Sequence, residues 1–445
     1  MGSTVYLKTS RTIKNWAARL SPWLNRLWGE QGFFIFLAAL TGAMAGYCAY
    51  LLKYLIDHLS RLLTSGFGDG PCYLLIGLPV AGVLLAGIFS RYVLKTDIED
   101  GCGKIADDMK SGRYRLRPRL ILGNMIAATF TLGFGGSAGS EGPIAYTGAA
   151  LGSNLGRSFS LSDRQLRLLI GIGSGAAIAG IFKAPVGGMM FTIEVLAMPM
   201  SVIALISLAV ACLIAGAVAS ACSGYTLDVA YHAPTPFGPD MILPIIALGV
   251  FCGLYSLWYS RTNAGILRYI LKLRNPWIRN LVTGLSIGLL LFLFPRLYGE
   301  GYSTVASLIN GHFDGLLDQS LWHGGSFDTV LWMIAGILLV KGAIVQLTNR
   351  GGGVGGDFAP TLFAGALCGF LFAALSNNLL GTQLSLADFS FFGMSAVMAG
   401  TIQAPLMALF LTTEMTGDMA MLLPLMIAAA ISYAMVRTAR RLSRR

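Results

Sequence analysis

Long apolar runs separated by short polar segments occupy most of the chain. They lie at residues 33–52, 73–89, 196–221, 242–259, 281–294, 330–345, 361–375 and 419–436. Several runs reach the roughly 20 residues that a helix needs to cross a bilayer, and the shorter ones predict tilted, broken or re-entrant helices. Because the runs are continuous and do not alternate between polar and apolar positions, they favour helices over a β-barrel.

A Gly-rich interrupted motif occurs twice in this pattern. Its first copy, residues 139–152, opens with GSEGP, and its second copy, residues 356–369, opens with GDFAP. The prolines of the two copies, Pro143 and Pro360, are 217 positions apart, and the Gly-Ala pairs and closing glycines keep the same offset. A second repeated segment, AGIFKAP and AGTIQAP, follows each copy. The chain is therefore a duplication, and paired Gly/Pro interruptions indicate a transport site made from broken helices.

The duplication and the apolar runs together predict an all-α integral membrane protein. The expected organisation is a basic cytoplasmic segment at 1–31, a first membrane half at 32–222, a Gly- and Pro-rich linker at 223–242, a second membrane half at 243–436 and a basic cytoplasmic tail at 437–445.

Composition supports a membrane protein and gives its expected orientation. Hydrophobic residues make up 55% of the chain and charged residues only 12%, against about 25% charged in an ordinary soluble domain. The formal net charge is +11, and basic residues cluster at both ends, which places both termini in the cytoplasm by the positive-inside rule. Nucleic-acid binding by these ends is the weaker alternative. We expect the lipid bilayer to be the partner, in the plasma membrane (the inner membrane of a bacterium), and no nucleic acid.

The side chains that support most enzyme and metal chemistry show no matching pattern. The chain has seven cysteines and four histidines, but no C-x-x-C or H-E-x-x-H spacing, so we expect no metal, no cofactor and no disulfide framework. The segment GGSAG at residues 135–139 fits the G-x-S-x-G of serine hydrolases. That motif needs a preceding strand, whereas here it lies among membrane helices, and we expect no enzyme.

Each copy of the interrupted motif predicts a helix that begins inside the membrane. Pro143 and Pro360 fit the first helical turn, where backbone N–H groups lack intrahelical partners. Those N–H groups and the positive end of the helix dipole form an anion site. The alternative is a kinked helix with packing glycines, and the pairing of the two copies favours the ion site.

Glu141 lies inside the first copy of the motif. A carboxylate at membrane depth is costly and points to function. At an anion site it can act as a tethered anion that blocks when charged and leaves when protonated. The alternative is a glutamate on a surface loop. The matching position of the second copy is Phe358, so the two halves are not chemically equivalent.

Two further acids, Glu194 and Glu414, recur in both halves, each nine residues after the proline of the second repeated segment. Because they recur, we expect a structural role, either capping loop amides or pairing with Lys or Arg.

Four segments of the chain resemble the motifs of the CLC chloride channels and transporters. GSEGP at residue 139 resembles their G-(K/R)-E-G-P, and GDFAP at residue 356 resembles their G-x-F-x-P. APVGGMMFTIEV at residue 184 is similar to their A-P-L-A-G-x-L-F-x-I-E, and GEGY at residue 299 to their G-x-G-Y. The four stand in order and cover roughly residues 35–436.

The resemblance implies an inverted repeat of two halves and a homodimer whose subunits each have a pore for chloride or a related small anion. It implies that Glu141 is the gating glutamate. The anion path is expected along Gly139, Ser140, Gly142, Gly356, Phe358 and Ala359.

The chain departs from the family pattern at three places. The best match to the family's G-S-G-x-P begins at Gly101, so that Cys102 replaces the anion-coordinating serine, and a thiol is a weaker donor. The family's final helix carries a tyrosine that completes this site, and Tyr433 belongs to the helix before it. Proton-coupled members usually have a second glutamate where this chain has Val195.

These departures, Val195 above all, favour a chloride channel over a chloride/proton antiporter. A gated chloride channel, sensitive to voltage or pH and with Glu141 as its gate, is the first hypothesis. A chloride/proton antiporter that uses an unconventional internal proton route is the alternative.

Overall fold

The computed structural model describes residues 2–68, 72–95, 101–199, 201–224, 237–313, 315–322 and 325–442. These residues form helices and connecting loops, and nine of the helices are long and apolar enough to cross a membrane. All eight predicted apolar runs fall largely within helices, so the all-α membrane fold is confirmed.

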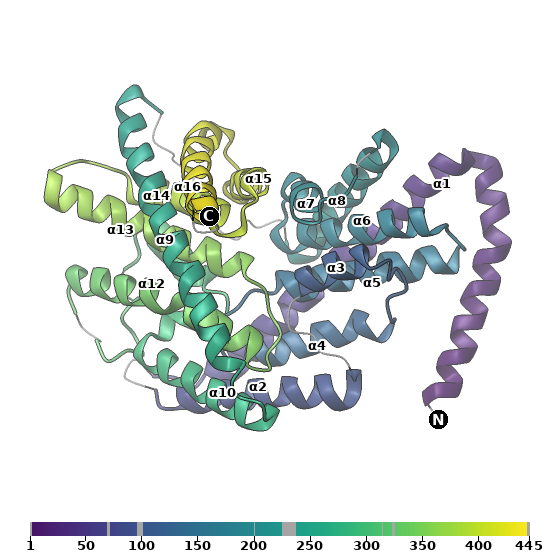
Figure 1. Ribbon diagram of the computed structural model, residues 1–445, viewed down its shortest axis with the longest axis horizontal. Helices are drawn as coiled ribbons and strands as arrows, with labels where there is room; N and C mark the ends of the chain where they lie inside the picture. The colour runs from purple at the N-terminus through teal and green to yellow at the C-terminus, as the bar shows by residue number, and fades with distance from the viewer. Residues whose placement is uncertain are drawn as a thin grey trace.

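The first half contains ten helical elements (Figure 1, purple to teal). They are α1 Gly2–Thr64, α2 Leu74–Ile88, η1 Phe89–Leu94, α3 Gly101–Lys110, α4 Arg119–Gly133, α5 Glu141–Ser158, α6 Asp163–Phe182, α7 Pro185–Met190, η2 Phe191–Val195 and α8 Val202–Ser223.

The second half contains eleven helical elements (Figure 1, teal to yellow). They are η3 Pro239–Met241, α9 Ile242–Ile270, α10 Pro276–Leu293, η4 Pro295–Leu297, α11 Tyr302–Ile309, α12 Phe327–Arg350, α13 Phe358–Leu380, α14 Leu386–Ile402, α15 Pro405–Thr416, η5 Met419–Met421 and α16 Leu422–Leu442.

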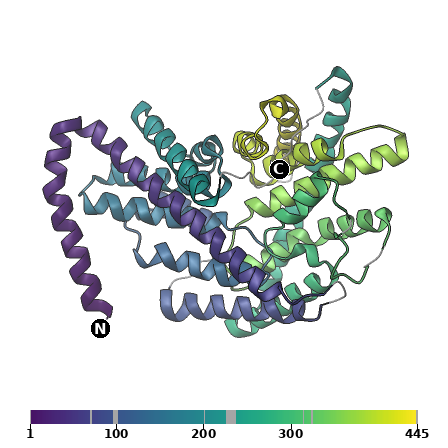
Figure 2. The ribbon, with the colours of Figure 1, turned by 180° about the vertical axis from the view of Figure 1, so that it is seen from behind.

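The two halves lie side by side and use the same internal packing. In the first half α5 packs on α6 and α1 on α8, and in the second half α13 packs on α14 and α9 on α16. Figure 2 shows the same division from behind, with the long α1 running along the first half. The inverted repeat predicted from the sequence is therefore present as two matching sets of helices.

The glycines that recur in the two motifs let helix backbones touch. A Cβ atom on Gly148 would collide with the carbonyl of Gly173 in α6, and one on Gly365 would collide with the carbonyl of Gly393 in α14. Small residues at such contacts allow the close backbone approach on which helix packing in membranes depends. The repeated glycines therefore join α5 to α6 and α13 to α14.

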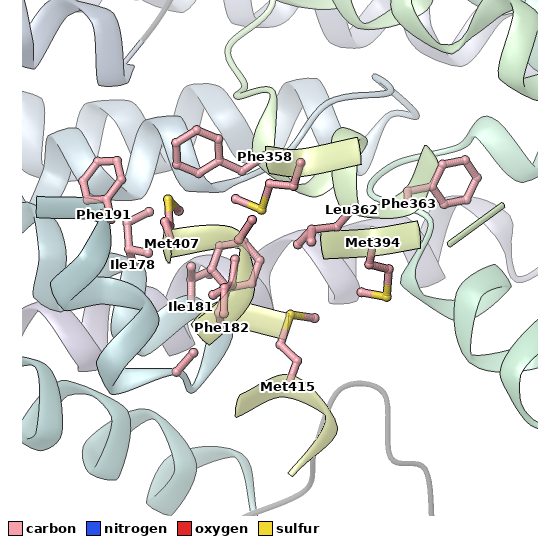
Figure 3. Close-up of a cluster of buried hydrophobic side chains, with 14 of the residues drawn as sticks. Ile178, Ile181, Phe182, Phe191, Phe358, Leu362, Phe363, Met394, Met407 and Met415 are labelled. Carbon is pink, nitrogen blue, oxygen red and sulfur yellow. The ribbon is translucent and has the colours of Figure 1, made fainter. Parts of the chain in front are cut away.

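Apolar side chains from both halves meet where the halves face each other. Figure 3 shows this cluster, to which α6 contributes Phe182, η2 contributes Phe191, α13 contributes Phe358 and α15 contributes Met407. The rings of Phe191 and Phe358 meet edge to face with centroids 5.7 Å apart. Phe358 thus packs the interface between the halves.

The predicted linker lies between two helices, whereas the predicted boundaries at residues 31/32 and 436/437 fall inside α1 and α16. Helix α8 ends at Ser223 and α9 begins at Ile242, but residues 225–236 of the predicted linker lie outside the described residues. Residues 2–31 of the predicted basic segment belong to α1, which is kinked at Gly29, where φ is 67°. In the tail, residues 437–442 extend α16 and residues 443–445 lie outside the described residues.

Of the nine helices that are long and apolar enough to cross a membrane, the sequence patterns missed one and misplaced the start of another. Helix α6 was not predicted as a span, because its GIGSGAAIAG stretch is small rather than strongly apolar. The apolar run that begins at residue 196 becomes helical only at Val202, since Ala197 has a positive φ of 48°.

Candidate functional site

The Gly-rich loop that precedes α5 (the first loop) and the Gly-rich loop that precedes α13 (the second loop) bind directly to each other at the centre of the molecule. The N–H of Gly139 donates to the carbonyl of Gly356 over 3.0 Å, and the N–H of Gly356 donates to the carbonyl of Gly139 over 2.7 Å. These bonds bring together the first residues of α5 and α13, one from each half. The predicted pairing of two interrupted helices is present.

Two threonines hold these loops in a reciprocal way. The Oγ1 of Thr348, in α12, accepts a hydrogen bond of 3.2 Å from the N–H of Ser137 in the first loop. The Oγ1 of Thr131, in α4, accepts one of 2.9 Å from the N–H of Val354 in the second loop. Each loop is therefore fixed by a helix of the other half.

The carboxylate of Glu141 occupies the N-terminus of α13. Its Oε1 accepts hydrogen bonds from the N–H of Phe358 and from the N–H of Ala359, the latter over 3.2 Å. The side chain is only 1% exposed, so the surface-loop interpretation is wrong. A free anion would use the same amides, because the N–H groups of a first helical turn have no other partner.

Gly139 and Gly356 leave the space that this carboxylate fills. A Cβ atom at either position would collide with the carboxylate of Glu141. Gly142, the second residue of α5, lies against the backbone of Gly355 and Gly356. These positions form the wall beside the charged group.

A cavity of 190 Å³, which we call the α3 cavity, opens beside Glu141. Its walls are Cys102, Glu141, Gln346, Asn349, Arg350, Gly356, Asp357, Phe358 and Ile402. Helix α3 therefore brings Cys102 to the same space as Glu141, as the motif alignment predicted. The anion-binding role of Cys102 stays a prediction.

A second carboxylate, which the sequence analysis did not single out, lies on the other side of Glu141. The Oε1 of Glu300 accepts hydrogen bonds from the N–H of Ser140 over 2.7 Å and from its Oγ over 2.6 Å. Glu300 also lines a larger cavity of 420 Å³, the α1 cavity, with Lys53, Asp57 and Arg296. The sequence signal for Glu300 is an acid between two glycines, Gly299 and Gly301, in a membrane protein, because acids at membrane depth usually have a function.

A buried lysine lies near these two carboxylates. Lys341 of α12 has no exposed surface, and its Nζ donates to the Oγ of Ser137 over 2.9 Å. It interacts electrostatically with both Glu300 and Glu141, and it lies 4.5 Å from the ring centre of Phe363. A single lysine inside the apolar run 330–345 is the sequence feature that could have revealed it, since charges at membrane depth pair with one another.

The sequence matches the model of a known protein family. The family model described as "Voltage gated chloride channel" matches residues 82–437, which is well over half of the chain.

The chain belongs to the CLC family.

Individual CLC proteins are similar along most of their length. The voltage-gated ClC-type chloride channel ClcB of Escherichia coli is 31% identical over 324 residues, covering 71% of this chain and 72% of that protein. The H(+)/Cl(-) exchange transporter ClcA of Vibrio vulnificus is 25% identical over 409 residues, covering 88% and 84%. The crystal structure of a slow cyanobacterial Cl-/H+ antiporter superposes with a TM-score of 0.76 at 22% identity and covers 91% of this chain and 94% of that one.

The two recurrent glutamates of this CLC chain cap helices of the opposite half. Glu194 accepts hydrogen bonds from the N–H groups of Leu406 and Met407, over 3.2 and 2.8 Å, at the start of α15. Glu414 accepts from those of Val186 and Gly187, over 3.0 and 2.8 Å, at the start of α7. The predicted capping role is confirmed.

The other two departures from the CLC pattern lie away from the centre. Val195 is the last residue of η2 and lines neither the α3 cavity nor the α1 cavity. Tyr433, in α16, accepts a hydrogen bond from Arg437 one turn further along its own helix and also lines neither cavity.

Proposed function

We propose that this CLC protein exchanges chloride, or a related small anion, for protons across the membrane. The observation that carries the proposal is the position of the Glu141 carboxylate on the amides of Phe358 and Ala359. A tethered carboxylate and a dissolved anion compete for these donors. Protonation removes the charge of Glu141, so that chloride takes its place, and the return of the carboxylate expels chloride.

This competition links the two fluxes because one side chain serves both. Each time Glu141 leaves the amides it carries a proton, and each time it returns it has given that proton up. Exchange requires that Glu141 gain its proton from one side of the membrane and release it to the other. The ClcA relative from Vibrio vulnificus bears the name of such an exchanger.

The proposed orientation places the α1 cavity outside the cell and the α3 cavity inside. Arg437, Arg440 and Arg441 lie at the end of α16, which the positive-inside rule assigns to the cytoplasm. Arg440 donates to the carbonyl of Thr401 over 3.2 Å, and the next residue, Ile402, lines the α3 cavity. The α1 cavity is lined by the far end of α1, including Thr64.

The anion path proposed between these cavities passes the amides and small residues around Glu141. It includes Gly139, Ser140, Gly142, Gly356, Phe358 and Ala359, with Cys102 at the cytoplasmic side. A homodimer in the plasma membrane, with one path in each subunit, is the assembly that the CLC resemblance suggests.

A gated chloride channel is the second candidate function. It is favoured by Val195, which stands where proton-coupled members usually have a glutamate, and by the channel name of the Escherichia coli relative. In a channel Glu141 opens and closes the path without carrying protons across it. A difference of only a few kcal/mol in barrier separates slow exchange from fast conduction.

Paired flux measurements distinguish the two functions. Purified protein is reconstituted in proteoliposomes under a chloride gradient with the voltage clamped by valinomycin, and chloride and proton movement are recorded together. We expect protons to be driven uphill by chloride. Chloride movement without any proton movement would overturn exchange and establish the channel.

A further inference from the structure

We propose that Asp357 is the cytoplasmic-side proton carrier of this protein, passing protons between the α3 cavity and Glu141. The inference rests on the exchange function proposed above and names the internal route that such exchange requires. Val195 cannot supply that route, because its side chain is apolar and does not line the α3 cavity.

Asp357 lies where such a carrier has to be. It is the residue immediately before α13 and is directly bonded in sequence to Phe358, whose N–H binds the Glu141 carboxylate. Asp357 and Glu141 line the same cavity of 190 Å³. Asp357 is half-buried, whereas Glu141 is buried, so Asp357 is the more accessible of the two acids.

The neighbours of Asp357 hold it in place and balance its charge. The Nδ2 of Asn349 donates to its Oδ1 over 3.0 Å. The ionisable groups that share its cavity or interact with it include Arg350 from α12, Cys102 from α3, Glu141 from α5 and Tyr259 from α9. Arg350 supports the charged form of the carboxylate, and the nearby Glu141 opposes two simultaneous negative charges.

Unpartnered buried atoms indicate that the α3 cavity holds water between the two acids. The Oε2 of Glu141, the Oε1 of Gln346 and the Oδ1 of Asn349 are buried and have no hydrogen-bond partner among the described residues. All three side chains line the α3 cavity. Buried polar atoms of this kind are normally satisfied by water, and the volume accommodates several molecules.

The proton step balances without any other reactant. A hydronium ion from the cytoplasm gives its proton to an oxygen of Asp357 and becomes water. The O–H bond on Asp357 then breaks as a new O–H bond forms on the Oε2 of Glu141, through the intervening water, and Asp357 becomes a carboxylate again. Neutral Glu141 releases the amides of Phe358 and Ala359, and chloride binds to them.

Replacing Asp357 with asparagine tests this route. Asp357→Asn keeps the size of the side chain but cannot carry a proton. In the flux measurement above we expect loss of proton transport with chloride flux retained. The matched control is Glu194→Gln, which neutralises an acid that caps α15 and lines neither cavity, and we expect it to leave coupling unchanged.

Uphill proton transport by Asp357→Asn at the wild-type proton-to-chloride ratio would overturn the inference while leaving the exchange function intact. Absence of proton movement in the unmodified protein would overturn the exchange function itself, so the two failures are distinguishable.

A variant that loses both fluxes is resolved by adding Glu141→Gln. Recovery of chloride flux in the double variant supports the inference, because it shows that a Glu141 deprived of protons was blocking the path. Continued absence of chloride flux overturns it, because Asp357 is then needed for conduction or folding and not for proton supply.

Discussion

Three glutamates of this protein each accept hydrogen bonds from a helix N-terminus of the opposite half. Two of them are related by the internal repeat, and the third is not. Glu194 and Glu414 form a reciprocal pair, in which each half caps a helix of its partner. Glu141 has no counterpart, because the matching position in the second half is Phe358. A carboxylate at a helix N-terminus therefore has a structural role in the repeated pair, whereas the same interaction of the unrepeated Glu141 is the one that we propose to be functional.

The bonding of the carboxylates shows why. Both oxygens of Glu194 and both oxygens of Glu414 accept a backbone hydrogen bond. Only the Oε1 of Glu141 does so, while its Oε2 has no partner among the described residues. Glu141 therefore gives up two backbone hydrogen bonds when it leaves, as many as each cap has, but its second oxygen is available for a proton.

Removing Glu141 is expected to have the largest effect on transport. In the unmodified protein we expect chloride flux to fall as pH rises, because a charged Glu141 would compete with chloride for the amides of Phe358 and Ala359. In Glu141→Ala we expect chloride flux to be independent of pH and at least about tenfold faster above neutral pH, the change that follows from about 1.4 kcal/mol. Flux measured across a pH series checks this, and a retained pH dependence would contradict the gating role.

Removing Glu414 is expected to affect stability and to spare transport. Glu414→Ala leaves the N–H groups of Val186 and Gly187 without their charged acceptor, which costs about 1–3 kcal/mol. Thermal unfolding of the detergent-solubilised protein should show a lower midpoint, with a smaller change in Glu414→Gln. Chloride flux per folded protein should stay pH-dependent, and a loss of that dependence would remove the distinction from Glu141.

Removing the hydroxyl of Ser140 tests the second central carboxylate. Ser140→Ala deletes the 2.6 Å bond to Glu300 but keeps the 2.7 Å bond from the backbone N–H. We expect a loss of stability of about 1 kcal/mol and retained coupling of chloride to protons. Complete loss of the coupling between chloride and proton flux would show that Glu300 takes part in transport, as proposed for Glu141, and is not only structural.

Restoring a hydroxyl at Cys102 should have the smallest effect. Cys102→Ser replaces a weak donor with a stronger one at the edge of the α3 cavity. We expect a change of a few fold in the preference among small anions, which corresponds to about 1 kcal/mol or less. Relative chloride, bromide and nitrate fluxes measure it, and unchanged ratios would show that Cys102 does not face the anion.

The repeated features of the fold and the unrepeated Glu141 could be predicted from the sequence, whereas most other features that occur once were missed. The two motifs identified the facing helix ends, and the recurrence of Glu194 and Glu414 indicated a structural role, as caps or as ion-pair partners, of which the structure shows the caps. Glu300 and Lys341 occur once, and their contacts join residues 160 and 204 positions apart. Asp357 was visible in the second motif, but its relation to Glu141 depends on the cavity that α3, α5 and α12 enclose together.

The bonds that join the two Gly-rich loops also bear on how fast this protein can work. Rocking one half against the other would break the paired bonds of Gly139 and Gly356 and those of Thr131 and Thr348 in every cycle. Collective movements of that size take microseconds to milliseconds, whereas the movement of one side chain leaves these backbone bonds in place. Because the two Gly-rich loops are hydrogen-bonded to each other, we expect the transport cycle to move the Glu141 side chain and to leave the backbone around it in place. We therefore expect turnover to be timed by the arrival of protons and to depend little on the viscosity of the surrounding lipid.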